Sequence, residues 1–213
     1  MWQSNNQTAA VGLGYSSGVN DGGCALTQGN QFYQIQSGVL KSAPLTIECL
    51  VMPTNRFGGG GWAIGTGLPL LGQTAAGLPN AVDLAGTAFN GAVALSFWQW
   101  HQLALVMTTT AATLYVDGAS VAVHTAGQPN TTSNWEIGSD GTNGWPGFVS
   151  EVAVYSSALS AARMAAHFAA IDNANQVPVA AAAGGTGGGG TSVTNPNYLS
   201  ILQQILQSVR KQF

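Results

Sequence analysis

Residues 100–124, WHQLALVMTTTAATLYVDGASVAVH, carry the clearest structural pattern in this 213-residue chain. The segments 101–107 and 113–116 are rich in strand-forming residues, and the small polar stretch between them predicts a β-hairpin. Asp117-Gly118 follows at once, and this pair favours a tight turn with positive φ at both residues. Residues 120–124 should then form the returning strand, so the pattern predicts three consecutive antiparallel strands.

Similar runs extend over residues 23–155, where Gly, Pro, Asn and Asp interrupt short alternating segments at regular intervals. This arrangement is typical of an all-β sandwich. Alternate positions from Leu45 to Val51 place apolar side chains on one face of a strand, and the other face is half apolar, so we expect cover on both sides. The glycines at 58–61 are predicted to form a hairpin tip and not a phosphate loop, because no Lys-Ser or Lys-Thr follows them.

Helical spacing begins after the last predicted strand, residues 148–155. Ser160 is placed as the N-cap of a helix, and Leu159, Met164 and Phe168 would give that helix an apolar side to pack on the sandwich. We therefore expect one folded domain over residues 1–175.

The composition changes abruptly after that domain. Residues 176–196 are rich in Ala and Gly, cannot build a core and are predicted to form a flexible linker. Residues 197–213 are predicted to form an amphipathic helix for oligomerisation or anchoring, with an apolar seam made of Leu199, Leu202, Ile205, Leu206, Val209 and Phe213. So short a helix is marginal alone in water, so we expect it to bind copies of itself or a groove on another protein, with folding back onto its own sandwich as the weaker alternative.

Composition also argues against several functions. Charged residues make up only 6% of the chain, the net charge is −3, and the five Lys and Arg residues are spread out. Nucleic-acid binding requires clustered basic side chains, so no such partner is expected. The sequence begins without a secretory signal, and no apolar run is long enough to span a bilayer. We expect a protein made in the cytoplasm and kept there or exported as part of an assembly.

The two cysteines, Cys24 and Cys49, are too few for a disulfide framework or a zinc site. We predict that both are buried structural thiols. The three histidines lie at a strand start, at a strand end and in the helix, a spacing that brings no two of them onto one metal ion.

Three stretches of the sequence carry a family resemblance. Residues 22–53 look like a pair of opening strands, residues 100–118 give the most specific match, and residues 137–161 supply the closing strands. Together they resemble the laminin-G-like members of the concanavalin-A-like superfamily. The resemblance implies a two-sheet antiparallel jelly-roll sandwich with a lectin-like character and a short helix after the last strand.

The resemblance also bears on chemistry. Polysaccharide-cleaving relatives carry two carboxylates close together in a Glu-x-Asp-x-x-Glu arrangement, and no such cluster exists among the eight scattered acids of this chain, so we expect no enzymatic activity. Calcium-binding relatives often carry Asp where this chain has Ser150, and the preceding loop offers only Asp140 and Asn143 as oxygen ligands. We therefore expect no cofactor and no metal site, with calcium left as a weaker alternative.

Tryptophans remain as the candidate ligand contacts. Trp62, Trp98, Trp100, Trp135 and Trp145 could stack on sugars where they are exposed, the alternative for each being a place in the core. Trp145 ranks first because it lies beside a polar loop, and Asp140 and Asn143 of that loop are candidate contacts with it. Trp135 and Trp62 rank next, so Trp145, Asp140, Asn143, Trp135 and Trp62 are the five predicted ligand contacts.

Two functions fit these features. The first is a non-catalytic virion surface component, namely a capsid decoration, head fibre or tail protein, which displays the lectin-like domain and is held by its C-terminal helix to other virion proteins or to itself. The second is a free, extracellular glycan-binding module at a cell surface, in which the helix makes oligomers that raise avidity.

Overall fold

A computed structural model of the chain describes residues 3–4, 15–16, 24–27, 32–54, 60–65 and 67–175. The chain divides into two units, residues 1–177 and 178–213, and every described residue belongs to the first. The predicted linker at 176–196 and the predicted helix at 197–213 lie outside the described residues and stay predictions.

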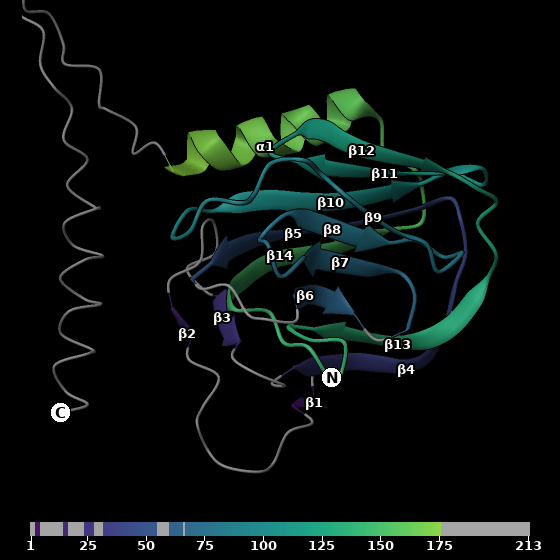
Figure 1. Ribbon diagram of the computed structural model, residues 1–213, viewed down its shortest axis with the longest axis horizontal. Helices are drawn as coiled ribbons and strands as arrows, with labels where there is room; N and C mark the ends of the chain where they lie inside the picture. The colour runs from purple at the N-terminus through teal and green to yellow at the C-terminus, as the bar shows by residue number, and fades with distance from the viewer. Residues whose placement is uncertain are drawn as a thin grey trace, which may run out of the picture. The chain divides into compact units, whose positions relative to one another are not determined.

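The described strands form two seven-stranded antiparallel sheets that face each other (Figure 1). Sheet A has the order β1 (Gln3–Ser4), β4 (Tyr33–Lys41), β13 (Thr131–Ile137), β6 (Gly61–Gly65), β7 (Leu70–Gln73), β8 (Pro79–Val82) and β9 (Ala88–Asn90). Sheet B has the order β12 (Ala119–Thr125), β11 (Ala111–Val116), β10 (His101–Met107), β5 (Leu45–Pro53), β14 (Gly147–Tyr155), β3 (Cys24–Thr27) and β2 (Tyr15–Ser16). The predicted two-sheet sandwich is confirmed.

The pattern at residues 100–124 forms the expected elements. β10 pairs with β11 in a register that places Leu105 opposite Leu114, and β11 pairs with β12. The turn between β11 and β12 has φ values of 51° at Asp117 and 76° at Gly118, as predicted for an Asp-Gly pair.

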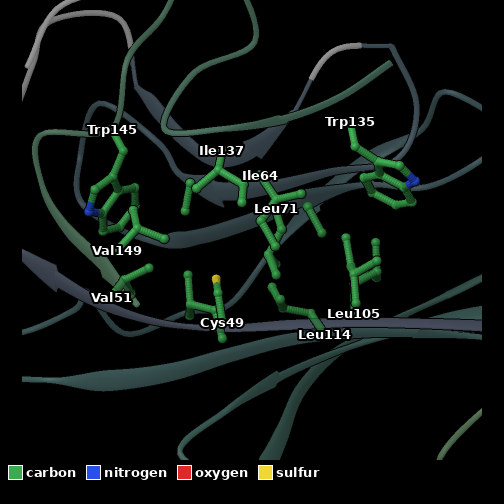
Figure 2. Packing of buried hydrophobic residues seen from close by; sticks show 14 of the residues in the cluster. Cys49, Val51, Ile64, Leu71, Leu105, Leu114, Trp135, Ile137, Trp145 and Val149 are labelled. Atoms are coloured by element: carbon green, nitrogen blue, oxygen red, sulfur yellow. The ribbon is translucent and has the colours of Figure 1, made fainter. Parts of the chain in front are cut away.

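The core fills the space between the two sheets. Leu105 and Leu114 of sheet B face Ile64 and Leu71 of sheet A, and all four are at most 1% exposed (Figure 2). Cys49 also lies in this core as a free buried thiol, as predicted, and burial raises the pKa of that thiol far above its usual value.

A single described helix, α1 (Ala161–Asn175), lies on the outer face of sheet B (Figure 1). The Ser160 hydroxyl accepts a hydrogen bond from the backbone N–H of Arg163 at 3.2 Å, so the predicted N-cap is confirmed. Met164 is fully buried against Ala104, Val106 and Tyr115 of the sheet. The Leu159 backbone N–H donates to Thr46 and His167 contacts Glu48, so this segment also covers the outer face of β5. Within the described part of the chain, no helix has the length and apolar character needed to cross a bilayer.

The prediction of a hairpin tip at the glycine run was wrong. The strands on either side of it, β5 and β6, belong to different sheets, so the connection crosses from one layer to the other. A glycine run does not tell which sheet the next strand joins, because that depends on distant pairing such as that of β6 with β13.

Candidate functional site

Trp145, the first-ranked candidate, lies inside the protein. Trp145 is 0% exposed, and its indole packs at one end of the core close to Val149 and Val51 (Figure 2). The Trp145 backbone N–H donates to the carbonyl of Gly138 at 2.7 Å, which closes the polar loop that precedes it. The expectation of an exposed stacking ring at Trp145 was therefore wrong, because the loop folds inward over the end of the sandwich.

Trp135 lies at the opposite end of the core from Trp145, as Figure 2 shows, and is only 8% exposed. The ammonium of buried Lys41 sits 3.8 Å from the centroid of its ring and donates to the carbonyl of Asn134 at 2.7 Å. Burial lowers the pKa of Lys41 to about 8, and the charge of Glu136 opposes part of that shift. Trp135 does not form one site with Trp145, because both rings are buried and they lie at opposite ends of the core.

The loop between β13 and β14 holds its predicted polar residues in a compact turn. One Asp140 carboxylate oxygen accepts the backbone N–H groups of Thr142 at 2.8 Å and Asn143 at 2.6 Å, and the other accepts from the Asn143 amide at 3.3 Å. Calcium takes six to eight oxygen ligands, usually with several carboxylates. Among the described residues, no group of three or more His, Cys, Asp or Glu side chains is placed to hold a metal ion, and the Asp140 oxygens are bonded within the loop itself.

Trp62 lies beside that loop and is half-buried at the start of β6. Its backbone N–H donates to the carbonyl of Asn143 at 3.4 Å, and it forms an isolated bridge with Gly144. Of the five predicted ligand contacts, the structure therefore brings together Trp62, Asp140 and Asn143.

Phe97 and Trp98, in the loop before β10, are the exposed aromatic residues at the same end of the sandwich. Trp98 is 56% exposed with φ of 61°, and its backbone N–H donates to the carbonyl of Pro53 at 2.8 Å. Thr54, which follows Pro53, donates its backbone N–H to the carbonyl of Pro146 at 2.8 Å. Pro146 lies where the Asp140 loop ends. We call this end of the sandwich the aromatic rim and define it as Trp62, Phe97, Trp98, Asp140 and Asn143.

Trp98 is a candidate contact in the sequence but has no rank there. A signal was present, because Phe97-Trp98 lies between polar Ser96 and Gln99 just before a predicted strand. Local composition alone does not distinguish this exposed tryptophan from the buried Trp145, which also follows a polar loop.

Each histidine of the chain contacts a carboxylate through Nδ1. His101 lies 2.8 Å from Asp117, His124 lies 2.7 Å from Asp83, and His167 lies 3.0 Å from Glu48. At His101 the second ring nitrogen accepts the backbone N–H of Ser96 at 3.1 Å, so Nδ1 carries the proton and both ring nitrogens are used in structural hydrogen bonds. His101 therefore holds the β11–β12 turn in place through Asp117. Because both of its ring nitrogens are used in these bonds, it is not placed as a general base.

The comparison with known families follows from this architecture. The sequence pattern of the Concanavalin A-like lectin/glucanases superfamily matches residues 27–165. The chain belongs to this superfamily. No curated protein sequence matches this chain.

Solved structures share the fold at low sequence identity. Domain 4 of AbnA, an extracellular GH43 arabinanase from Geobacillus stearothermophilus solved with arabinotriose, has a TM-score of 0.58 and 16% identity over 78% of this chain and 86% of that chain. A putative carbohydrate binding protein from Bacteroides ovatus has a TM-score of 0.53 and 19% identity over 66% and 45% of the two chains. Trypanosoma rangeli sialidase has a TM-score of 0.58 and 14% identity over 83% of this chain but only 33% of its own length. These likenesses show the fold of this superfamily member.

Proposed function

We propose that this superfamily member is a non-catalytic carbohydrate-binding protein and that the aromatic rim contacts the glycan. The observation that carries the proposal is the exposure of Trp98 on a backbone in the left-handed region, with φ of 61°. A non-glycine residue there costs about 1–2 kcal/mol, and such conformations persist mostly at sites where they have a use.

The chemistry of the rim suits a sugar. The exposed Trp98 ring offers an apolar face to the C–H groups of a pyranose or furanose ring. Asp140 and Asn143 lie half-buried at the same end, where they offer polar groups for hydroxyls, and half-buried Trp62 lies beside them. The arabinotriose bound to AbnA domain 4 and the description of the Bacteroides ovatus protein as a putative carbohydrate binding protein support the same class of ligand.

Absence of catalysis is proposed from the state of the acids. Glycoside cleavage commonly uses one carboxylic acid as proton donor and one carboxylate as nucleophile or base, facing each other across the substrate. Asp83 and Asp117 accept several structural hydrogen bonds each, and the Asp140 carboxylate is used by its own loop. Asp140 is the one acid among the five residues that define the rim, and a single carboxylate does not make the required pair.

The test is binding of a panel of neutral oligosaccharides, with arabinotriose as the first probe, measured by titration calorimetry. Trp98→Ala is expected to weaken binding at least about tenfold without changing Tm, since the side chain is exposed. Val93→Ala is the matched control, because Val93 is 79% exposed in the same loop and lies outside the rim. A panel in which no oligosaccharide binds, or a Trp98→Ala variant that binds as well as wild type, would refute a sugar site at the rim.

We further propose that the domain is displayed on a virion, as a capsid decoration, head fibre or tail protein, through residues 197–213. Support comes from the sequence, where a Gly-rich stretch precedes a helical apolar seam that needs a partner. The partner would be the same helix in another copy or another virion protein. A free extracellular glycan-binding module, with the helix serving only to raise avidity, is the alternative.

Self-association through this seam can be measured directly. Leu202→Asp combined with Leu206→Asp in the full chain is expected to convert an oligomer into a monomer in light-scattering measurements, because both charges would enter the seam. Gln204→Asp, on the opposite side of the predicted helix, should leave the mass unchanged. A wild-type chain that is monomeric at micromolar concentration would rule out self-assembly and leave docking on another protein, to be tested by co-sedimentation with purified virions.

A further inference from the structure

The outer face of sheet A, which is turned away from sheet B, can be read from the registers of its strands. Leu71 of β7 and Ala81 of β8 are paired, are 0% exposed and lie in the core. Because side chains alternate along a strand, the next residue of β7, Gly72, and the preceding residue of β8, Asn80, belong to the outer face. The one helix within the described part of the chain, α1, lies on sheet B, so it does not cover this face (Figure 1).

One row of outer-face residues crosses four strands. Trp62 of β6 pairs with Gly72 of β7. Gly72 also pairs with Asn80 of β8, which in turn pairs with Asn90 of β9. Phe89 packs on the core, so Asn90 beside it belongs to the outer face. Adjacent strands lie about 4.8 Å apart, so the two asparagines continue one line that starts at Trp62. We call these four residues, Trp62, Gly72, Asn80 and Asn90, the outer row.

Glycines lie on both sides of Trp62. Gly72 is its partner on β7, and Gly144 is its partner in an isolated bridge on the other side. A Cβ at Gly72 would collide with the carbonyl oxygen of Gly61, so the close approach of the two backbones requires glycine there. Neither bridge partner therefore brings a side chain against the half-buried Trp62, and the position between Trp62 and Asn80 in the row carries none.

The two asparagines of the outer row offer amide groups for a ligand. Asn80 is half-buried, and its side chain makes no hydrogen bond within the part of the chain that the structure describes. Asn90 is exposed, and its amide N–H donates to the carbonyl of Gly91 at 3.0 Å, which leaves its own carbonyl oxygen to accept a bond. An amide has both donors and an acceptor, so it can bond to neighbouring hydroxyl groups of a sugar.

An apolar row runs beside the outer row on the same face. Leu70 pairs with Val82, and Val82 pairs with Ala88, each two residues from the outer row on its strand. Leu70 and Val82 are half-buried, and Ala88 is exposed. Neither row contains a charged residue. An aromatic ring, amide groups and aliphatic surface without charge suit a neutral sugar, whose C–H groups pack on apolar side chains and whose hydroxyls bond to amides.

We propose that the outer row extends the aromatic rim into a track for a neutral oligosaccharide, which crosses β6, β7, β8 and β9. The track rests on the proposed glycan contact at the rim and deepens it, because Trp62 belongs to both. The first sugar units would contact the rim, and the following units would lie over Gly72 and bond to Asn80 and Asn90. The ligand of this site is thus an oligosaccharide long enough to reach from the rim to the asparagines.

Calorimetric titration of the full chain with arabinotriose and arabinohexaose, and with cellotriose and cellohexaose as a second pair, tests the track. In a pair that binds, the hexasaccharide is expected to bind at least about tenfold more tightly than the trisaccharide, because its added units reach the asparagines. Asn80→Ala should remove most of that difference and leave trisaccharide binding unchanged. Its Tm should shift by at most about 2 °C, because the Asn80 side chain has no hydrogen-bond partner in the described fold.

Asn130→Ala is the matched control, because Asn130 is an exposed asparagine in the loop before β13 and lies outside both rows. It should bind both sugars of a pair like wild type. A hexasaccharide that binds no more tightly than the trisaccharide overturns the track and leaves the rim standing. The same conclusion follows if Asn80→Ala keeps the full difference.

Two further outcomes separate the track from the rim and from another occupant. If Trp98→Ala binds like wild type while Asn80→Ala loses the hexasaccharide, the rim is overturned and the outer row is supported. If no oligosaccharide of either pair binds, the rim and the track fall together. Self-association of the wild-type chain that Asn80→Arg abolishes in light-scattering measurements would show that a second copy occupies this face, and it would overturn the track.

Discussion

Replacing Trp145 by alanine will lower the free energy of unfolding by about 3–5 kcal/mol. The indole is fully buried at one end of the core, where it packs near Val149 and Val51. Removal of so large a side chain loses its burial and leaves a cavity, because the surrounding sheets can relax into the space only in part. Urea unfolding followed by circular dichroism gives the change at neutral pH.

Trp98→Ala is the matched control for that experiment, because it removes the same side chain from a position that is 56% exposed. Its effect on the free energy of unfolding should stay within about 0.5 kcal/mol. A loss at Trp145→Ala no larger than the loss at Trp98→Ala would contradict the inward fold of the loop. It would return Trp145 to the surface position that the sequence suggested.

Asp83→Asn is expected to cost about 2–3 kcal/mol at pH 7. One oxygen of the fully buried carboxylate accepts the Thr87 backbone N–H at 3.0 Å, and the other faces His124 Nδ1 at 2.7 Å and the Gln128 amide at 3.1 Å. The Gln128 carbonyl oxygen is occupied by the N–H of Leu84, which fixes its amino group toward Asp83. An asparagine would therefore direct an N–H₂ group at another donor.

The same variant should change the response to acid. Burial acts to raise the pKa of Asp83, but hydrogen bonds from Gln128, Thr87 and His124 outweigh it, so the pKa lies below its usual value. The stabilisation from this lowered pKa is complete above the unfolded value of about 4 and is lost as pH falls through the folded value. The difference between wild type and Asp83→Asn should thus shrink as pH falls below about 5.

Asp140→Asn provides the comparison for Asp83→Asn. Asp140 is half-buried and bonds mainly to two backbone N–H groups through one oxygen, which the asparagine carbonyl can replace. Its cost should stay below about 1 kcal/mol at every pH. A pH-independent difference at Asp83 would show that the carboxylate charge does not contribute to stability.

Local signals explain why most of the sandwich could be predicted. Alternation along β5, the Asp117-Gly118 turn and the Ser160 cap each depend on residues close together in the sequence. These signals correctly predicted the strand, the turn and the start of the helix. They also predicted that β5 would be covered on both faces, because its second face is half apolar.

The site could be predicted only in part, because exposure depends on contacts between distant segments. Trp145 and Trp98 both adjoin polar loops, yet the first is buried through a bond to Gly138 and the second is held outward by a bond to Pro53. Glu48 contacts His167, which lies 119 positions further along the chain, and it accepts a hydrogen bond from the Tyr155 hydroxyl. No spacing rule in the sequence reveals these contacts with an imidazole and a phenol.

Placement of α1 makes the two sides of the sandwich unlike. Apolar side chains of β10 and β11, including Val106 and Tyr115, lie beneath the helix and not against solvent. A neighbouring molecule cannot stack on that part of sheet B without first displacing the helix. In a close-packed array of this domain, the helix-covered face and the sheet A face would therefore make different contacts. The domain could pack in only one orientation with respect to its neighbours.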